Sequence, residues 1–228
     1  MLPVMFRRIV FAAAISGLVA GLILSALQSL DAIPLILKAE TYEKREEMTK
    51  AVQAHRDEEN DEGGFSRTAL TVISNVLTSI GFALLLISAF TIHGDVDWKK
   101  GILWGLGGFA TFFLAPSIGL SPELPGSLAA PLPERQMWWV ATVSGTGGGL
   151  ILLLFKAGAH WKGLGVLLIA LPQIVGAPLP EEHGSLAPEQ LSRSFVMVTF
   201  ATAAIYWLIL GGVAGLLSKR FEGVEGRS

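Results

Sequence analysis

The stretch IVFAAAISGLVAGLILSALQSL, residues 9–30, contains no charged residue. A bilayer core of about 30 Å requires about 20 apolar residues in an α-helix, so this stretch is long enough to span a membrane. Arg7 and Arg8 precede it, as in a signal peptide. However, the apolar stretch is longer than a usual signal core, and no small-x-small cleavage site ends it. We therefore interpret residues 9–30 as a retained transmembrane helix rather than a cleaved signal.

Five further apolar stretches follow along the chain, at residues 68–92, 101–120, 137–155, 163–177 and 195–217. The fourth of these is the shortest and contains Pro172. Unpaired backbone groups are very costly in lipid, so we expect the stretches to form helices packed as a bundle. The sequence thus predicts an all-α, polytopic membrane helix bundle of about six transmembrane helices, forming a single transmembrane domain over residues 1–228.

Composition excludes several other classes of protein. Hydrophobic residues make up 51 % of the chain and charged residues 16 %, whereas soluble domains carry about 25 % charged residues. The chain has no cysteine, which excludes disulfides, Cys-ligated zinc and thiol catalysis. A net charge of −2 argues against a nucleic-acid partner. We find no nucleophile–base pair and expect that the protein is not an enzyme.

Glycine-rich runs occur inside the apolar stretches. Residues 145–149 read GTGGG and superficially resemble a phosphate-binding loop. No predicted strand precedes them and no Gly-Lys-Ser/Thr follows, so the phosphate-loop pattern is incomplete. Small residues let membrane helices approach closely. We interpret these glycines as residues for close helix packing or as a local break in the helix that lines a cavity.

Cations and acids separate along the chain. If each apolar stretch crosses the membrane, successive loops lie on opposite sides. The side that holds the N-terminus is then rich in cations: Arg7, Arg8, Lys99, Lys100, Lys156, Lys162, Lys219, Arg220 and Arg227. All acids except Asp95, Asp97, Glu222 and Glu225 fall on or beside the other side. Short cytoplasmic loops carry an excess of Lys and Arg, which predicts a bacterial inner-membrane protein with both termini in the cytoplasm. The polar loop at residues 38–66 is then extracytoplasmic, and its Glu/Lys spacing predicts a helix over residues 39–54.

Parts of the chain resemble one another. Residues 98–103 read WKKGIL and residues 161–164 read WKGL, while residues 122–128 read PELPGSL and residues 180–186 read PEEHGSL. A fainter third copy ends at Pro34. We expect three helical-hairpin repeats, which would place three acidic, proline-rich loops around one outer mouth.

The outer loops supply candidate metal ligands beside prolines, which stiffen a loop by fixing φ. Carboxylate and imidazole groups bind Co²⁺, Ni²⁺ and Zn²⁺. The candidate ligands are Glu40, Glu43, Glu123, Glu181, Glu182 and His183. The alternative reading is that acidic residues in outer loops bind no metal. Neutral amides also lie inside the spans, at Gln28, Asn75 and Gln173, and we interpret them as hydrogen-bonding groups between helices.

The chain resembles the CbtA family of proposed cobalt transporter subunits. The resemblance covers most of the chain and rests on five groups of residues. These are Phe6-Arg-Arg with the glycine-containing first helix and Gln28, Ala39-Glu40-x-Tyr42-Glu43, Ala115-Pro-x-Ile-Gly-Leu-x-Pro-Glu123-Leu-Pro-Gly126, Arg135-Gln-x-Trp-Trp139, and Leu171-Pro-x-Ile-Val-Gly-Ala-Pro178. One departure is Gln173, where the family often has His.

The resemblance implies a membrane subunit of a cobalt (divalent transition-metal) ion transporter linked to cobalamin supply. Glu40, Glu43, Glu123 and His183 fall in matching loops. It also implies a small one-helix partner with a histidine-rich end, as in the CbtB family. We expect no resident cofactor, since the metal is the transported ion. A second hypothesis is a structural or assembly subunit with no transport pathway of its own, and the lack of charged residues within the spans favours it.

Overall fold

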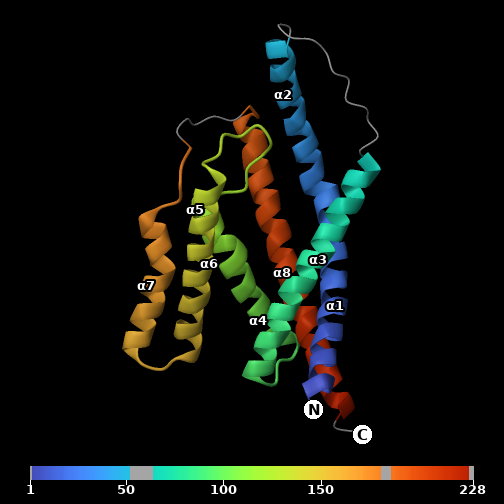
Figure 1. Ribbon diagram of the computed structural model, residues 1–228, viewed down its shortest axis with the longest axis vertical. Helices are drawn as coiled ribbons and strands as arrows, with labels where there is room; N and C mark the ends of the chain where they lie inside the picture. Colours follow the sequence, from blue (N-terminus) through green and yellow to red (C-terminus); the bar gives the residue numbers. More distant parts are fainter. Residues whose placement is uncertain (1, 52–63, 181–185, 226–228) are drawn as a thin grey trace. The chain divides into compact units, whose positions relative to one another are not determined.

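The computed structural model describes residues 2–51, 64–180 and 186–225 (Figure 1). Nearly all of these residues lie in helices, and the described ranges contain no strand. The predicted all-α class is confirmed. Five of the described helices are long and apolar enough to cross a membrane, so the chain is a membrane protein.

The first helix differs from the prediction at its C-terminal end. Helix α1 (Leu2–Leu27) passes through a π-helical segment, η1 (Gln28–Ala32), directly into α2 (Ile33–Ala51). Pro34 has no backbone N–H to donate, and the wider π turn before it changes the hydrogen-bond register without ending the helix. The helix predicted at residues 39–54 is therefore a continuation of the first apolar helix as far as Ala51, and residues 52–54 lie outside the described residues.

The other elements follow the predicted apolar stretches. Helix α4 likewise continues through a π-helical segment, η3, into α5. The predicted span at residues 163–177 corresponds to α7, which has 17 residues and is shorter than the five long helices. The bounds are α3 (Gly64–His93), α4 (Trp98–Phe109), η3 (Ala110–Leu114), α5 (Ala115–Gly119), α6 (Leu132–Phe155), α7 (Ala159–Val175) and α8 (Glu189–Glu225).

Contacts divide the chain into two compact units, which we describe separately. Unit 1 comprises Met1–Asp31, Arg56–Leu106 and Ala201–Ser228. Unit 2 comprises Ala32–His55 and Gly107–Phe200. The three hairpin repeats and the single transmembrane domain stay predictions.

In unit 1, helices α1 and α3 form an antiparallel pair (Figure 1). A Cβ added to Gly21 would lie 2.6 Å from the Cα of Val76, and one added to Gly17 would clash with the backbone of Ile80. A larger residue at either position would therefore push the helices apart. Glycine spacing of four residues gives α1 a flat surface on which α3 packs.

The second packing contact in unit 1 joins α4 to α8 through two glycine pairs. Gly101 and Gly105 of α4 meet Gly211 and Gly215 of α8. A Cβ added to any of the four would lie closer than 3.0 Å to backbone of the other helix or, for Gly215, to the carbonyl oxygen of Asp97 just before α4. Both helices thus carry a Gly-xxx-Gly motif, and the two motifs face each other. Such facing motifs let van der Waals contacts between backbones drive helix association in lipid.

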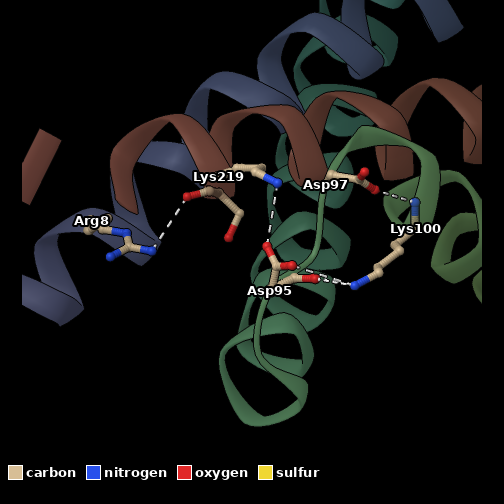
Figure 2. Close-up of polar contacts among 6 residues, drawn as sticks. Arg8, Asp95, Asp97, Lys100 and Lys219 are labelled. Atoms are coloured by element: carbon tan, nitrogen blue, oxygen red, sulfur yellow. Dashed lines mark hydrogen bonds and ion pairs between the residues drawn. The ribbon is translucent and has the colours of Figure 1, made fainter. Parts of the chain in front are cut away.

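Charged groups from three parts of unit 1 gather beside this crossing (Figure 2). Lys219 Nζ lies 3.5 Å and Lys100 Nζ 3.7 Å from the Asp95 carboxylate, and Arg8 donates to the Ser218 carbonyl at 3.4 Å. Asp95 is 75 % exposed, so each ion pair stabilises the fold only slightly. The network instead shows that three cations predicted to share one membrane side do lie together.

Unit 2 contains the α6–α7 hairpin, which also packs through glycine. A Cβ added to Gly145 would lie 2.6 Å from the carbonyl oxygen of Leu168, and one added to Gly149 would lie 2.6 Å from that of Gly165. Trp138 Nε1 donates to the carbonyl of Pro172 at 3.1 Å, nearer the other end of the hairpin. The interpretation of the GTGGG run as a packing surface is confirmed.

Candidate functional site

A small apolar core in unit 2 joins three segments that are distant in sequence. We call it the loop cluster; its buried members are Ala32, Ala39, Leu124, Ala187, Leu191 and Phe195. They come from the end of η1 and α2, from the loop between α5 and α6, and from the start of α8 with the residues just before it. Each of these segments carries, or directly adjoins, acids that the sequence predicts as metal ligands.

Glu123 lies in the loop between α5 and α6, next to a buried anchor of the loop cluster. Leu124 is 4 % exposed and holds the loop in place, whereas Glu123 is exposed. Arg135, in the first turn of α6, donates from Nη2 to Glu123 Oε2 at 3.2 Å. Sequence reasoning missed this ion pair, although an arginine just inside the next helix was a visible signal.

The loop that carries Glu123 is tied to the segment after His183. Gly126 has φ +76°, a conformation that glycine adopts without strain, and its carbonyl accepts a hydrogen bond from the Leu186 N–H at 3.3 Å. The Leu186 side chain also lies beside Gly126. Gly126 and Leu186, which belong to the two Gly-Ser-Leu sequences predicted to be repeat copies, thus meet at this point.

Glu40 and Glu43 lie on α2, and both are half-buried. Glu43 follows Ala39 by four residues and Glu40 follows Ile36 by four, so each stands on or beside the α2 face that packs into the loop cluster. The fold therefore brings the segments of Glu40, Glu43 and Glu123 together in unit 2.

The remaining predicted ligands, Glu181, Glu182 and His183, lie outside the described residues. Within the ranges that the structure describes, no three His, Asp or Glu side chains are arranged to hold a metal ion. The predicted ligand set stays a prediction for this reason.

Amides inside the long helices form the interhelical hydrogen bonds expected from the sequence. In unit 1, Asn75 Nδ2 donates to Gln28 Oε1 at 2.7 Å and to Ser25 Oγ at 3.0 Å. In unit 2, Gln173 Nε2 donates to the Ala115 carbonyl at 2.9 Å. The interpretation of Gln28, Asn75 and Gln173 as hydrogen-bonding groups is confirmed.

Sequence reasoning missed the two π-helical segments beside these amides. Gln28 begins η1, and Ala115 directly follows η3. Pro34 and Pro116 each stand two residues after the end of the preceding π segment, so the prolines were the available signal. π-Helical turns are frequent at functional sites.

The chain matches one known protein family over nearly its whole length. The family model described as "Probable cobalt transporter subunit (CbtA)" matches residues 6–219 of the 228. No curated protein and no solved structure has a significant match. The matched range includes nearly all of the five long apolar helices and each of the three acidic segments. The chain therefore belongs to the CbtA family of probable cobalt transporter subunits.

Proposed function

We propose that this chain is the membrane subunit that takes up Co²⁺, or a related divalent transition-metal ion, for cobalamin supply. Membership of the CbtA family supports the transport role. The observation that carries the proposed capture site is the loop cluster, which gathers the segments of Glu40, Glu43 and Glu123 in one unit.

Metal capture in this proposal uses carboxylates and one imidazole. Glu123 is exposed and held by Arg135, so an arriving cation competes with a guanidinium for the carboxylate. His183, with Glu181 and Glu182, adds the ligand type that favours Co²⁺ over Mg²⁺ or Ca²⁺. The ion then passes along helix faces lined by small residues and by amides such as Gln28 and Gln173.

The proposed orientation puts both termini in the cytoplasm and the acidic segments outside an inner membrane. The gathering of Arg8, Lys100 and Lys219 supports one cation-rich face, since cytoplasmic loops carry such an excess. The chain has no cysteine, so a single introduced cysteine is a unique label site. A membrane-impermeant maleimide should label Leu128→Cys in intact cells and Arg220→Cys only after permeabilisation. The reverse pattern would invert the orientation.

Uptake of radioactive cobalt into proteoliposomes tests the function and the site separately. The purified chain is reconstituted alone and together with a small, histidine-rich CbtB-like protein. The double variant Glu123→Gln/His183→Ala should lower the initial rate at least about tenfold, a loss seen even for residues that only support metal ligands. Glu189→Gln is the matched control, because Glu189 also pairs with an arginine in unit 2, at 2.6 Å from Arg193.

The outcomes distinguish the two hypotheses. If the wild type takes up cobalt and the double variant does so at the same rate, the proposed capture site is wrong but the transport function stands. No uptake by the wild type, alone or with the partner, would favour a structural or assembly subunit.

A further inference from the structure

Cationic side chains from three helices of unit 1 converge on one small region (Figure 2). Lys100 Nζ lies 3.7 Å and Lys219 Nζ 3.5 Å from carboxylate oxygens of Asp95. Arg8 reaches the same end of α8, where it donates to the carbonyl of Ser218, the residue before Lys219. Helices α1, α4 and α8 thus each bring one cation to this region, and we call Arg8, Lys100 and Lys219 the cation cluster.

Cations outnumber acids in the segments that form the cluster. Residues 6–10, 93–101 and 217–221 contain six Lys or Arg side chains and two Asp side chains. Extending the last range to residue 228 gives seven cations and four acids. One of the acids, Asp97, accepts a hydrogen bond from the backbone N–H of Lys100 at 2.9 Å and so belongs to the start of α4. The segments carry positive charge that their own acids do not balance, and such a surface attracts anions.

The cluster is exposed, and the turn beneath it is fixed. The side chains of Lys100 and Lys219 are 50 % and 57 % exposed. The turn between α3 and α4 is anchored by Val96, which is 3 % exposed, and by a 2.7 Å hydrogen bond from Lys100 Nζ to the Asp95 carbonyl. Ion pairs this exposed are weak, so an anion with more negative oxygens can displace the Asp95 carboxylate from the two lysines.

Exposed apolar side chains continue from the cluster along the same helix faces. Leu103 stands three residues after Lys100 on α4, and Leu216 stands three residues before Lys219 on α8, which places each leucine on the face of its lysine. The two leucines are 66 % and 48 % exposed. Trp98, at the start of α4, is 50 % exposed, as is usual for a tryptophan at the level of lipid headgroups. The ligand that fits has an anionic head and an apolar tail.

We propose that the cation cluster binds the phosphate group of an anionic phospholipid, whose acyl chains run along Leu103 and Leu216. Lys and Arg donate strong, charge-assisted hydrogen bonds to phosphate oxygens. Basic sites between transmembrane helices bind anionic lipid headgroups with the same chemistry. A free phosphate ion would meet the same cations but would leave the two leucines uncovered. The site does not depend on the proposed cobalt transport.

Thermal unfolding of the purified full-length chain in mixed micelles tests the proposal. Phosphatidylglycerol should raise the melting temperature above its value in phosphatidylcholine with the same acyl chains. The rise should be about 5 °C or more at concentrations 100-fold above Kd, because the lipid binds the folded state. No cobalt is present, so failure of this site and failure of cobalt transport are separate results.

Two double variants locate the lipid. Lys100→Gln/Lys219→Gln should lose most of the rise, because it removes two of the three cations of the cluster. Its melting temperature in phosphatidylcholine should change little, since the ion pairs to Asp95 are exposed. The matched control is Lys156→Gln/Lys162→Gln, which removes the same charge from two exposed lysines beside the turn between α6 and α7 and should keep the rise.

Asp95→Asn separates lipid binding from a purely structural role of the network. Asp95 has φ +27°, in the positive-φ range where asparagine is also enriched, so the substitution suits the turn. Removal of the competing carboxylate should tighten phosphatidylglycerol binding about twofold to fivefold, the range for an exposed ion pair of modest strength. Titration of the lipid against the melting temperature measures this change. A purely structural network would lose stability in both lipids without any gain in affinity.

Three further results would overturn the proposal. Equal melting temperatures of the wild type in the two lipids would show that the cluster recognises no anionic headgroup. A rise that persists in Lys100→Gln/Lys219→Gln, or that the control variant loses equally, would show that the lipid does not bind at the cluster. An equal rise caused by inorganic phosphate in phosphatidylcholine micelles would make the ligand a free anion rather than a lipid.

Discussion

Gly101 of α4 and Gly211 of α8 face each other backbone to backbone. A Cβ on either residue would lie closer than 3.0 Å to the carbonyl oxygen of the other. In lipid, helices do not associate by burying apolar surface from water, so such close contact is a main source of attraction between them. The contact joins the third and the last long helices of the chain within unit 1.

The first prediction concerns this glycine contact. Gly101→Ala should destabilise the fold by about 1–3 kcal/mol, the usual effect of forcing extra atoms into a packed interface. Gly107→Ala, on the same helix, is the control because an added Cβ there meets nothing within 4 Å. The free energy of unfolding of each variant, measured in detergent, gives both effects. Equal stability of the two variants would contradict the close α4–α8 contact.

The second prediction concerns the amide pair of unit 1. Gln28→Leu and Asn75→Leu each remove one partner of the 2.7 Å hydrogen bond between α1 and α3. A double-mutant cycle on the free energy of unfolding should give a coupling of about 0.6 kcal/mol, the average for hydrogen bonds between membrane helices. Thr78→Ala, on an exposed position of α3, should show no coupling to Gln28→Leu. A coupling of zero for the amide pair would mean that the bond does not form.

The third prediction concerns the guanidinium that pairs with Glu123. Arg135→Gln frees the Glu123 carboxylate and should tighten Co²⁺ binding about twofold to fivefold, the range expected for an exposed ion pair of up to 1 kcal/mol. Arg193→Gln is the control, since it frees the Glu189 carboxylate instead. Isothermal titration with Co²⁺ measures the change. If Arg135→Gln still tightens Co²⁺ binding when Glu123→Gln is also present, Glu123 is not a ligand.

The fourth prediction concerns the start of α4 and its dependence on pH. The Lys100 backbone N–H donates to Asp97 Oδ1 at 2.9 Å, and this hydrogen bond, aided by Lys219, holds the pKa of Asp97 below its ordinary value of 3.8. A lowered pKa means that the charged cap stabilises the folded state above that ordinary value, and that the stabilisation is lost as pH falls through the lower, folded-state pKa.

Asp97→Asn tests this cap because an amide oxygen still accepts the hydrogen bond but does not titrate. The stability difference between wild type and Asp97→Asn should therefore be constant near neutral pH and change only below about pH 3.8. Asp97→Ala should be less stable than Asp97→Asn across the whole range, as measured by unfolding in detergent. A difference that is independent of pH would show that folding does not lower the pKa of Asp97.

Sequence alone was sufficient for the helical class and for the spans of α3, α4, α6 and α8. The reason is local: a long apolar run in lipid must satisfy its own backbone, and only a helix does so within one segment. Proline was harder to interpret. Pro34 does not end the first helix, and whether a proline ends a helix or is passed through a π turn depends on what packs around it.

Tertiary structure decided which residues meet. The sequence showed glycines at spacings of four, but not that those of α4 face α8 while those of α6 face α7. It named Glu40, Glu43 and Glu123 as candidate ligands, whereas their segments come together only through the burial of Leu124 and Phe195 in one core. Composition along a chain fixes which segments enter lipid, because transfer into a membrane depends on each segment separately. Which helix faces then pack together depends on the fit between surfaces that are distant in sequence, and no single segment encodes that fit.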